Sequence, residues 1–439
     1  MDSYWAFPKN GITLAFDKSS TATPRKKAPY MTFTSAPRID HTQSFLESPC
    51  RQASDCHLFA LDEAGVVFCE GRQEIYAFNT SATWIWMAME DGLPVTAIAA
   101  ELAEITDSPH EQTQDTVINL VGQWWALGLL SGSERNRPVL TRPPARSLPQ
   151  VDLQVDRVRV HRKKTYRLRR TLFTIGYGAA EQESMAHPIL AHLEDDETAA
   201  CNTELILAQT NSGYAVLRDG IIEEFCETLS GLGPAVKCCM MRIALNDHPY
   251  RFQIHGGVVE RDGQCVVLPA ESGSGKTCLV AGLVHDGWHY LSDECAPLEG
   301  NELRVQPIPI AMATKEGAWP VLAPYYPELD QATVHLREDG KHIRYLSPPP
   351  ESRGPDRPEG HKVRWIVFPA YNPAAQSELQ PLPRVEILQR LFAQCLSLPE
   401  RLNQAAVSRI VEWIRTIDGY LLPNSNLKEA VRLMNKLTP

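Results

Sequence analysis

The sequence predicts a multi-domain protein of the mixed α/β (α+β) class, and three observations support this prediction. Residues 58–133 hold short β-prone runs followed by three helical patterns, which is typical of a small winged-helix-like unit. Residues 134–150 are rich in Pro, Arg and Ser, which is a linker composition. Residues 151–439 open with several strand-like runs and include an apolar strand that leads into a Gly-rich turn and a helix. We therefore expect a small N-terminal domain joined to a larger α/β domain.

The bulk composition is that of an ordinary globular protein and disfavours two functional classes. The chain has 439 residues, of which 43% are hydrophobic and 22% charged. Its formal net charge of -10 disfavours a nucleic-acid-binding protein, which would normally be basic. No apolar run reaches the ~18 residues of a membrane span, and the N-terminus lacks the order of a signal peptide. We therefore expect no membrane contact and a cytoplasmic location. The 11 cysteines show no CxxC spacing, so we expect free core thiols rather than a metal site.

The N-terminal unit is predicted from local signals. Residues 1–57 are polar and turn-rich, and we expect a disordered or extended tail. Two β-prone runs, VVFCE and EIYAF, are then joined by Gly71-Arg72-Gln73, a hairpin signal. Asn79 or Ser81 can cap a first helix, a second begins near Pro94, and a third ends at Gly128.

A phosphate-binding loop is the strongest motif of the chain. The strand CVVLP leads into Ala270-Glu271-Ser-Gly-Ser-Gly-Lys-Thr277, and an apolar-faced helix follows. Glycines let backbone N–H groups turn toward phosphates, and a helix N-terminus adds positive dipole. Ala270 replaces the first glycine of the strict motif, which is tolerable if its φ is negative. We predict that Lys276 reaches the β/γ-phosphates of a nucleotide and that Thr277 binds Mg²⁺. The predicted nucleotide-binding residues are Ser272, Gly273, Ser274, Gly275, Lys276 and Thr277.

Two adjacent carboxylates follow the loop closely. Asp293 and Glu294 end the strand that comes directly after the helix of the phosphate loop. One carboxylate could hold Mg²⁺ while the other accepts a proton from an attacking hydroxyl. A solvated acidic turn before Pro297 is the alternative interpretation. Upstream, His255 ends the preceding strand in Ile-His-Gly-Gly and is either a structural or a catalytic histidine.

Taken together, these segments resemble the catalytic core of HPr kinase/phosphorylase, which shares ancestry with the nucleotide core of phosphoenolpyruvate carboxykinase. The likeness rests on the His-Gly-Gly strand, SGSGKT and the Ser-Asp-Glu strand end; it is close over residues 254–298 and extends by element order over roughly 155–320. It implies a kinase that uses ATP and Mg²⁺, with Asp293 as general base and Glu294 as metal ligand beside Thr277 and Asp293. Lys276 and His255 would be the other catalytic residues.

The sequence departs from this family pattern in ways that limit the expected activity. Ala270 replaces Gly, Glu294 replaces Asp, and the second signature associated with the phosphorylase half-reaction is missing, so we do not expect phosphorolysis. The Ser-Asp-Glu version resembles the branch called HPr-related kinases, several of which belong to peptide-modification pathways. Lys315 and Arg364 are further candidates for binding phosphate charge.

Residues 58–133 resemble a PqqD-type domain, the recognition element for precursor peptides of ribosomal origin (RiPPs). The likeness is carried by VVFCEGRQEIYAF, NTSATWIWMAMEDG, VTAIAAEL and WWALGLL. In that family a leader peptide adds a strand beside the hairpin and lies against the third helix. The resemblance therefore implies a groove between the helix at 114–127 and one strand, whose candidate peptide-binding residues are Val66, Val67, Phe68, Cys69 and Glu70.

The two resemblances together imply an ATP-dependent kinase for a Ser or Thr hydroxyl of a leader-bearing precursor peptide. A docking unit tethered to a kinase raises the effective concentration of its substrate. Two alternatives stay open: a kinase for a carrier protein or small metabolite with a regulatory N-terminal domain, and a nucleotide-gated peptide-binding adaptor without transfer chemistry. Leader dependence separates the first from our hypothesis, and the effect of Asp293→Asn separates the second. HPr kinases form hexamers, and a homo-oligomer is left open here.

Overall fold

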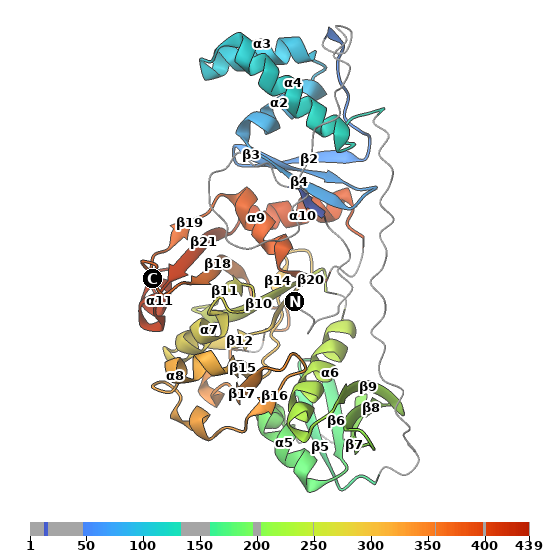
Figure 1. Cartoon of the computed structure of the whole chain (residues 1–439), viewed down its shortest axis with the longest axis vertical. Helices are drawn as coiled ribbons and strands as arrows, with labels where there is room; N and C mark the ends of the chain where they lie inside the picture. Colours follow the sequence, from blue (N-terminus) through green and yellow to red (C-terminus); the bar gives the residue numbers. More distant parts are fainter. Residues whose placement is uncertain are drawn as a thin grey trace.

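The computed structural model describes most of the chain (Figure 1). The described residues are 47–132, 159–195, 203–248, 250–355, 357–397 and 401–438, with the backbone of a short strand at 13–15. The predicted linker at 134–150 lies outside them, as does most of the predicted tail at 1–57. No helix in these ranges is long and apolar enough to cross a membrane.

The N-terminal unit is a four-stranded sheet covered on one face by three helices (Figure 1). In spatial order the strands are β1 (Thr13–Ala15), β4 (Glu74–Phe78), β3 (Ala64–Cys69) and β2 (Cys56–Leu61). The helices are α2 (Thr80–Glu90), α3 (Val95–Thr106) and α4 (His110–Ala126). Asn79 is the cap of α2, because its Oδ1 accepts a hydrogen bond of 2.9 Å from the Ala82 N–H. Inside the unit Phe78 stacks on Trp124 with ring centroids 4.9 Å apart.

A second sheet of five strands follows, covered by two helices in a shared apolar core. Its strands are β5 (Arg162–Leu168), β6 (Thr171–Tyr177), β7 (Thr203–Gln209), β8 (Tyr214–Arg218) and β9 (Ile221–Cys226). The helices are α5 (Ala180–Leu190) and α6 (Leu232–Asn246). Local pattern did not predict α5, which carries Pro188 and buries few residues.

The largest sheet carries the phosphate loop. Its main path runs β14 (Arg304–Val305), β13 (Cys295–Glu299), β10 (Phe252–Arg261), β11 (Gln264–Pro269), β18 (Val363–Tyr371), β21 (Asp418–Asn424) and β19 (Gln380–Pro381). Two further strands pair with β10, namely β12 (His289–Ser292) and β20 (Cys395–Ser397). Strands β11, β18 and β21 are parallel neighbours, so their carboxyl ends lie at one edge.

Helices cover both faces of this sheet, which explains the continuous apolar run of β11. Cys265 and Val267 pack on the side of α9 (Arg384–Ala393) and α10 (Gln404–Arg415). Val266 and Leu268 pack on the opposite side with α7 (Lys276–His285) and α11 (Leu427–Met434). Successive side chains of a strand point to opposite faces, so a strand buried on both faces has no polar alternation.

A small sheet, which lies beside α7 together with α8 (Trp319–Leu322), and several short helices complete the fold. The sheet consists of β15 (Met312–Lys315), β17 (His342–Leu346) and β16 (His335–Leu336). The short helices are α8, η2 (Ala191–Leu193), η3 (Leu229–Gly231), η4 (Glu316–Ala318), η5 (Pro327–Gln331) and η6 (Pro350–Ser352).

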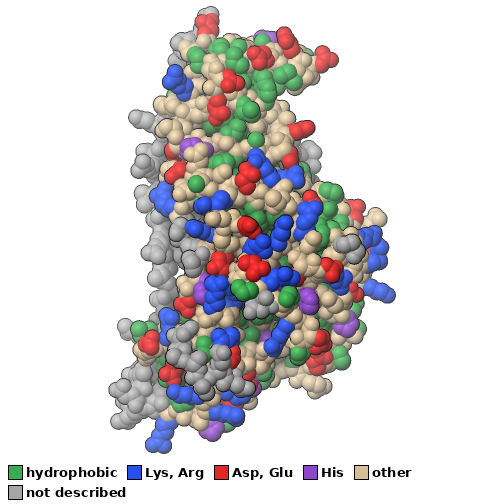
Figure 2. Space-filling view, turned by 180° about the vertical axis from the view of Figure 1, so that it is seen from behind, with side chains coloured by type: hydrophobic (Ala, Val, Ile, Leu, Met, Phe, Trp, Pro, Cys, Tyr) green, Lys and Arg blue, Asp and Glu red, His purple; other side chains and the backbone are tan. Residues whose placement is uncertain are grey.

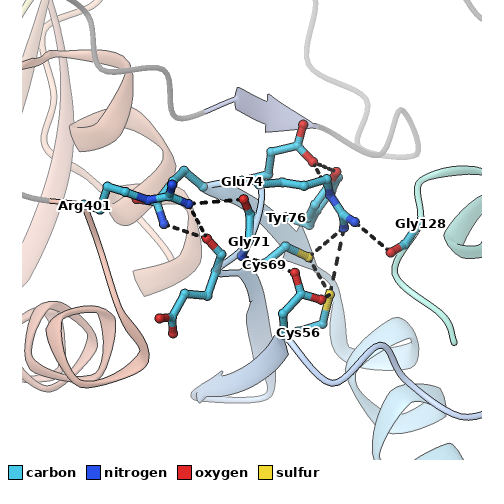
Figure 3. Close-up of polar contacts among 11 residues, drawn as sticks. Cys56, Cys69, Gly71, Glu74, Tyr76, Gly128 and Arg401 are labelled. Carbon is cyan, nitrogen blue, oxygen red and sulfur yellow. Dashed lines mark hydrogen bonds and ion pairs between the residues drawn. The ribbon is translucent and has the colours of Figure 1, made fainter. Parts of the chain in front are cut away.

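The N-terminal sheet packs its second face on α9 and α10 (Figure 1). Leu61, Val66, Phe68 and Ile75 belong to the same apolar core as residues of these helices. Polar contacts surround this interface: Gln73 exchanges two hydrogen bonds of 2.8 Å with the backbone of Leu402. Figure 3 shows Arg401 reaching the backbone of Gly71, an N–H···O contact of 3.2 Å. The N-terminal unit and the larger part of the chain are therefore joined by a buried interface.

Buried neutral histidines predict a loss of stability in mild acid. Burial lowers the pKa of His192, His255 and His335 to about 4, against about 6.5 for an unfolded chain. Between these values the unfolded state binds more protons, so the free energy of unfolding falls as pH falls from 6.5 toward 4. Each unit of pKa difference corresponds to about 1.4 kcal/mol.

We expect the thermal midpoint, followed by circular dichroism, to fall steadily between pH 6.5 and 4.5. The His335→Gln variant should show a shallower decline, because His335 is only 2% exposed and its titration would be removed. A midpoint independent of pH over this window would contradict this prediction.

Candidate active site

The phosphate loop is folded as its sequence predicts. Gly273 and Gly275 adopt φ angles of 95° and 85°, a left-handed region in which glycine is favoured. Gly275 is also the N-cap residue directly before α7. Ala270 is buried and does not adopt a positive φ, so alanine is compatible with this position. The predicted residues from Ser272 to Thr277 therefore lie together in the turn between β11 and α7.

Asp293 lies directly against this loop. Its Oδ2 accepts a hydrogen bond of 2.9 Å from the Thr277 hydroxyl, and its Oδ1 is 3.3 Å from the Lys276 Nζ. Lys276 Nζ also donates to the Asp293 carbonyl. Gly257 makes this approach possible, because a Cβ there would lie 2.4 Å from Val280 on α7. The structure thus brings together three of the predicted residues at the start of α7.

Burial makes Asp293 an unusual carboxylate. Asp293 is 1% exposed, and burial raises its pKa above the ordinary value while the charge of Lys276 opposes the rise. A raised pKa makes the ionised carboxylate a stronger base. The arrangement can therefore accept a proton from a hydroxyl group positioned beside the loop.

Glu294 forms an ion pair with a lysine that the sequence did not lead us to expect. Lys237, on α6, lies with its Nζ 2.8 Å from Glu294 Oε1, and the side chains are 6% and 17% exposed. Burial alone would raise the pKa of Glu294, but the charges of Lys237 and Lys276 lower it below its ordinary value. The role of Glu294 as a metal ligand stays a prediction. In this structure its carboxylate is paired with Lys237 instead. A lysine in the middle of the apolar helix AVKCCMMRIAL was the signal that could have identified Lys237.

His255 lies within β10 rather than at its end, because the strand continues to Arg261. Its Nδ1 is 2.9 Å from the carbonyl oxygen of Glu294 and is the donor of that hydrogen bond. Burial and the charge of Lys276 lower the pKa of His255 to about 4. The imidazole is therefore neutral near pH 7, and it holds the Asp293–Glu294 backbone without adding positive charge.

The two basic candidates have different positions. Lys315, at the end of β15, donates a hydrogen bond of 2.6 Å from Nζ to the Ser272 hydroxyl. Burial and the charges of Arg337 and Lys341 lower the pKa of Lys315. Arg364 begins β18, at the opposite end of the strands, and pairs with Asp418 at 2.7 Å. The proposal that Arg364 binds phosphate is therefore wrong.

The residues of the loop fit a magnesium nucleotide. Among the described residues, the buried Ser274 Oγ is one of the side-chain atoms without a hydrogen-bond partner, inside a turn that suits phosphate oxygens. Thr277 and Asp293 offer the adjacent oxygen atoms that Mg²⁺ prefers. Lys276 and Lys315 offer positive charge on two sides of the turn.

A second buried polar cluster lies at the other end of β11. One side-chain O, S or N atom from each of Glu260, Cys265 and His361 lies within 4.8 Å of the other two. The Arg357 guanidinium lies 3.1 Å from the Glu260 carboxylate. Burial would raise the pKa of Glu260, but the contacts with His361 and Arg357 lower it. The cluster is thus a buried charge network, and Cys265, like the other described cysteines, is not part of a disulfide.

The predicted groove beside β3 is not available in this structure. Strand β3 lies between β2 and β4, and both of its edges are paired. Glu70 follows the strand, and its carboxylate accepts a hydrogen bond of 3.1 Å from the Gln404 N–H. The remaining strand residues predicted to bind peptide are at most 1% exposed: Val66, Val67, Phe68 and Cys69. Residues 66–70 therefore form core and interface, because the structure adds a strand, β2, that the sequence pattern did not show.

Comparison with known proteins agrees with the prediction for the N-terminal unit. Residues 64–130 match the family model described as coenzyme PQQ synthesis protein D (PqqD). These residues are PqqD-like. The PqqD-like region spans β3 to α4, and β2 and β1 extend its sheet.

The larger part of the chain has a more distant likeness. The HPr(Ser) kinase/phosphatase from Coxiella burnetii matches with 11% identity, over 42% of this chain and 95% of that one. This is the family that the site motifs resemble. The TM-score is 0.20, so the match adds no structural argument to the geometry of the site. No curated protein sequence matches the chain.

Proposed function

We propose that this protein is an ATP-dependent kinase that phosphorylates a Ser or Thr hydroxyl of a leader-bearing precursor peptide. The observation that carries the proposal is the buried Asp293, which contacts both Lys276 and Thr277 of the phosphate loop. Such a carboxylate beside a phosphate loop suits proton acceptance during phosphoryl transfer. The PqqD-like region in the same chain suggests a peptide as the molecule that carries the hydroxyl.

Each residue of the site has a role in this proposal. When bound, Mg·ATP supplies the γ-phosphoryl group. Lys276 and the N–H groups of residues 272–276 would hold the β- and γ-phosphates, and Thr277 and Asp293 would hold the metal ion. Asp293 would accept the proton of the attacking hydroxyl while the hydroxyl oxygen bonds to phosphorus and ADP leaves. Lys237 and His255 are positioning residues, because they hold Glu294 and the strand end that presents Asp293.

We assign the leader to the outer edge of β4. A chain segment is already paired there: β1 pairs in parallel with β4, with Thr13 opposite Glu74 and Ala15 opposite Tyr76. At the other edge of the sheet, Arg415 of α10 donates a hydrogen bond of 2.7 Å to the Ala60 carbonyl. The pairing with β1 shows that the edge of β4 accepts an added strand, so we assign the leader to this edge, where it would replace β1.

The helices of the N-terminal unit also expose apolar side chains. In Figure 2, hydrophobic side chains gather on the N-terminal unit at the top of the molecule, with acidic side chains around them, and acidic and basic side chains are mixed below. Met87 and Ile105 are 49% and 65% exposed. On α4, Ile118 and Trp125 are half-buried and pack against the apolar core of the unit.

Weakening β1 should therefore strengthen leader binding. Proline has no N–H to donate to a ladder, so Leu14→Pro should release the edge of β4. We expect leader affinity, measured by fluorescence anisotropy, to rise about two- to tenfold, since the binding-competent fraction increases. Ser20→Pro, outside β1, is the matched control and should leave affinity unchanged. An unchanged or lower affinity for Leu14→Pro would mean that the leader binds elsewhere.

Intact-mass analysis tests the function. Candidate precursor peptides are incubated with the protein, Mg²⁺ and ATP, each with and without its leader. A gain of one phosphate that requires the leader supports the proposal. A gain that does not require the leader favours a kinase for another acceptor. Binding without a change in mass, with ATP intact, favours an adaptor without transfer chemistry.

A further inference from the structure

An exposed aromatic ring lies beside the phosphate loop and has no role in the mechanism above. Tyr371 is the last residue of β18 and is 52% exposed. Several large hydrophobic side chains are exposed in the described part of the chain, and among them Tyr371 is the aromatic one. Its N–H donates a hydrogen bond of 3.0 Å to the carbonyl of Ser274. A Cβ on Gly275 would lie 3.2 Å from the Tyr371 Cβ.

The topology of the sheet indicates which kind of ligand Tyr371 could contact. Strands β11, β18 and β21 are parallel neighbours, and ligands of such sheets bind outside the carboxyl ends of the strands. The loop after β11 would hold the phosphates of a nucleotide. On the side of β10, Asp293 and Glu294 occupy the neighbouring space. The ribose and base of a bound nucleotide would therefore extend toward the end of β18, where Tyr371 lies.

The backbone under this ring is well supported. Asn372, the next residue, donates its N–H to the carbonyl of Asn424 at 2.9 Å, and its Oδ1 accepts from the Ala374 N–H at 3.0 Å. Tyr371 is paired with Asn424 across β18 and β21. A ring on such a fixed strand end loses little freedom when a flat ligand stacks on it.

We propose that Tyr371 is the stacking platform for the nucleobase, which makes the end of β18 a purine-binding subsite. This inference rests on the proposed nucleotide function. Stacking on an aromatic ring needs no hydrogen-bond readout, so Tyr371 would favour the large purine face without distinguishing adenine from guanine. Any choice between ATP and GTP then depends on other residues.

Calorimetric titration of the full chain with two probes tests the proposal. Mg·ATP carries a base, whereas Mg·tripolyphosphate presents only the phosphates. We expect Tyr371→Ala to weaken ATP binding about tenfold, in line with the loss of one base–aromatic stack. Binding of tripolyphosphate should not change, and Tyr371→Phe should bind ATP like the unsubstituted protein. GTP should show the same loss as ATP.

Three results would overturn the proposal. Equal weakening of both probes by Tyr371→Ala would mean that the ring only supports the loop. Unchanged ATP affinity in Tyr371→Ala would place the base elsewhere, while leaving the nucleotide function intact. Failure of the unsubstituted protein to bind either probe would overturn the nucleotide function together with this inference. Because Tyr371 is exposed, its substitution should leave the thermal midpoint unchanged, which is measured alongside.

Discussion

Asp293→Asn should reduce phosphoryl transfer by about 10²- to 10⁴-fold, the range of a general base, with nucleotide affinity largely retained. The amide keeps the shape of the carboxylate. Its oxygen can still accept from the Thr277 hydroxyl, which lies 2.9 Å from the Asp293 carboxylate in the unsubstituted protein, and can still face the metal ion. The amide cannot accept the proton of an attacking hydroxyl. Transfer is measured by single-turnover mass analysis, and affinity by titration with a non-hydrolysable ATP analogue.

The matched control for Asp293→Asn is Glu271→Gln, which makes the same chemical change in the same loop. Glu271 is exposed, in contrast to Asp293 at 1% exposure. We expect the control to change turnover by less than about threefold, since exposed charges are strongly screened. Asp293→Asn also removes the negative charge that faces Lys276, which could destabilise the fold. Circular dichroism therefore checks that the variant is folded. Full turnover in Asp293→Asn would show that Asp293 is not the base.

Breaking the buried pair between Lys237 and Glu294 should be the most destabilising change at the site. Removing one partner of a buried ion pair typically costs about 3–5 kcal/mol, because the other charge stays buried without compensation. We expect Lys237→Met and Glu294→Gln each to lower the free energy of unfolding by an amount near this range. The double variant should lose less than the sum, which a double-mutant cycle in urea measures directly.

An exposed pair provides the control for this cycle. Lys163 and Glu204 lie 2.5 Å apart, but their side chains are 54% and 47% exposed. Lys163→Met should therefore cost only about 0–1 kcal/mol. If Lys237→Met costs no more than Lys163→Met, the carboxylate of Glu294 is not held by Lys237. Glu294 would then be free for the metal role that its sequence position implies.

Features contained in short windows of sequence were predictable. The glycines of the phosphate loop need positive φ angles, the run CVVLP is apolar because both sheet faces are covered, and Asn79 precedes the periodic residues of α2. The closeness of Asp293 to Thr277 also followed from local order, since only one helix separates the two strands. These parts of the fold and site depend on neighbours in the chain.

Features that depend on distant segments could not be predicted. Lys237 meets Glu294 only because the five-stranded sheet and α6 pack beside the phosphate-loop sheet. Strand β3 is internal because β2 pairs with it, and the weak pattern of CHLFAL did not indicate this strand. The edge of β4 is paired with residues 13–15, far away in the sequence. No local period encodes such pairings.

The central claim is that one chain both docks the leader and phosphorylates the attached core. The most direct measurement compares the rate of phosphate incorporation for three substrates: the intact precursor, the core alone, and the core mixed with a separate leader. We expect rapid transfer only to the intact precursor, because tethering raises the local concentration of the hydroxyl at Asp293. Equal rates for the intact precursor and the core alone, or no incorporation at all, would contradict the claim.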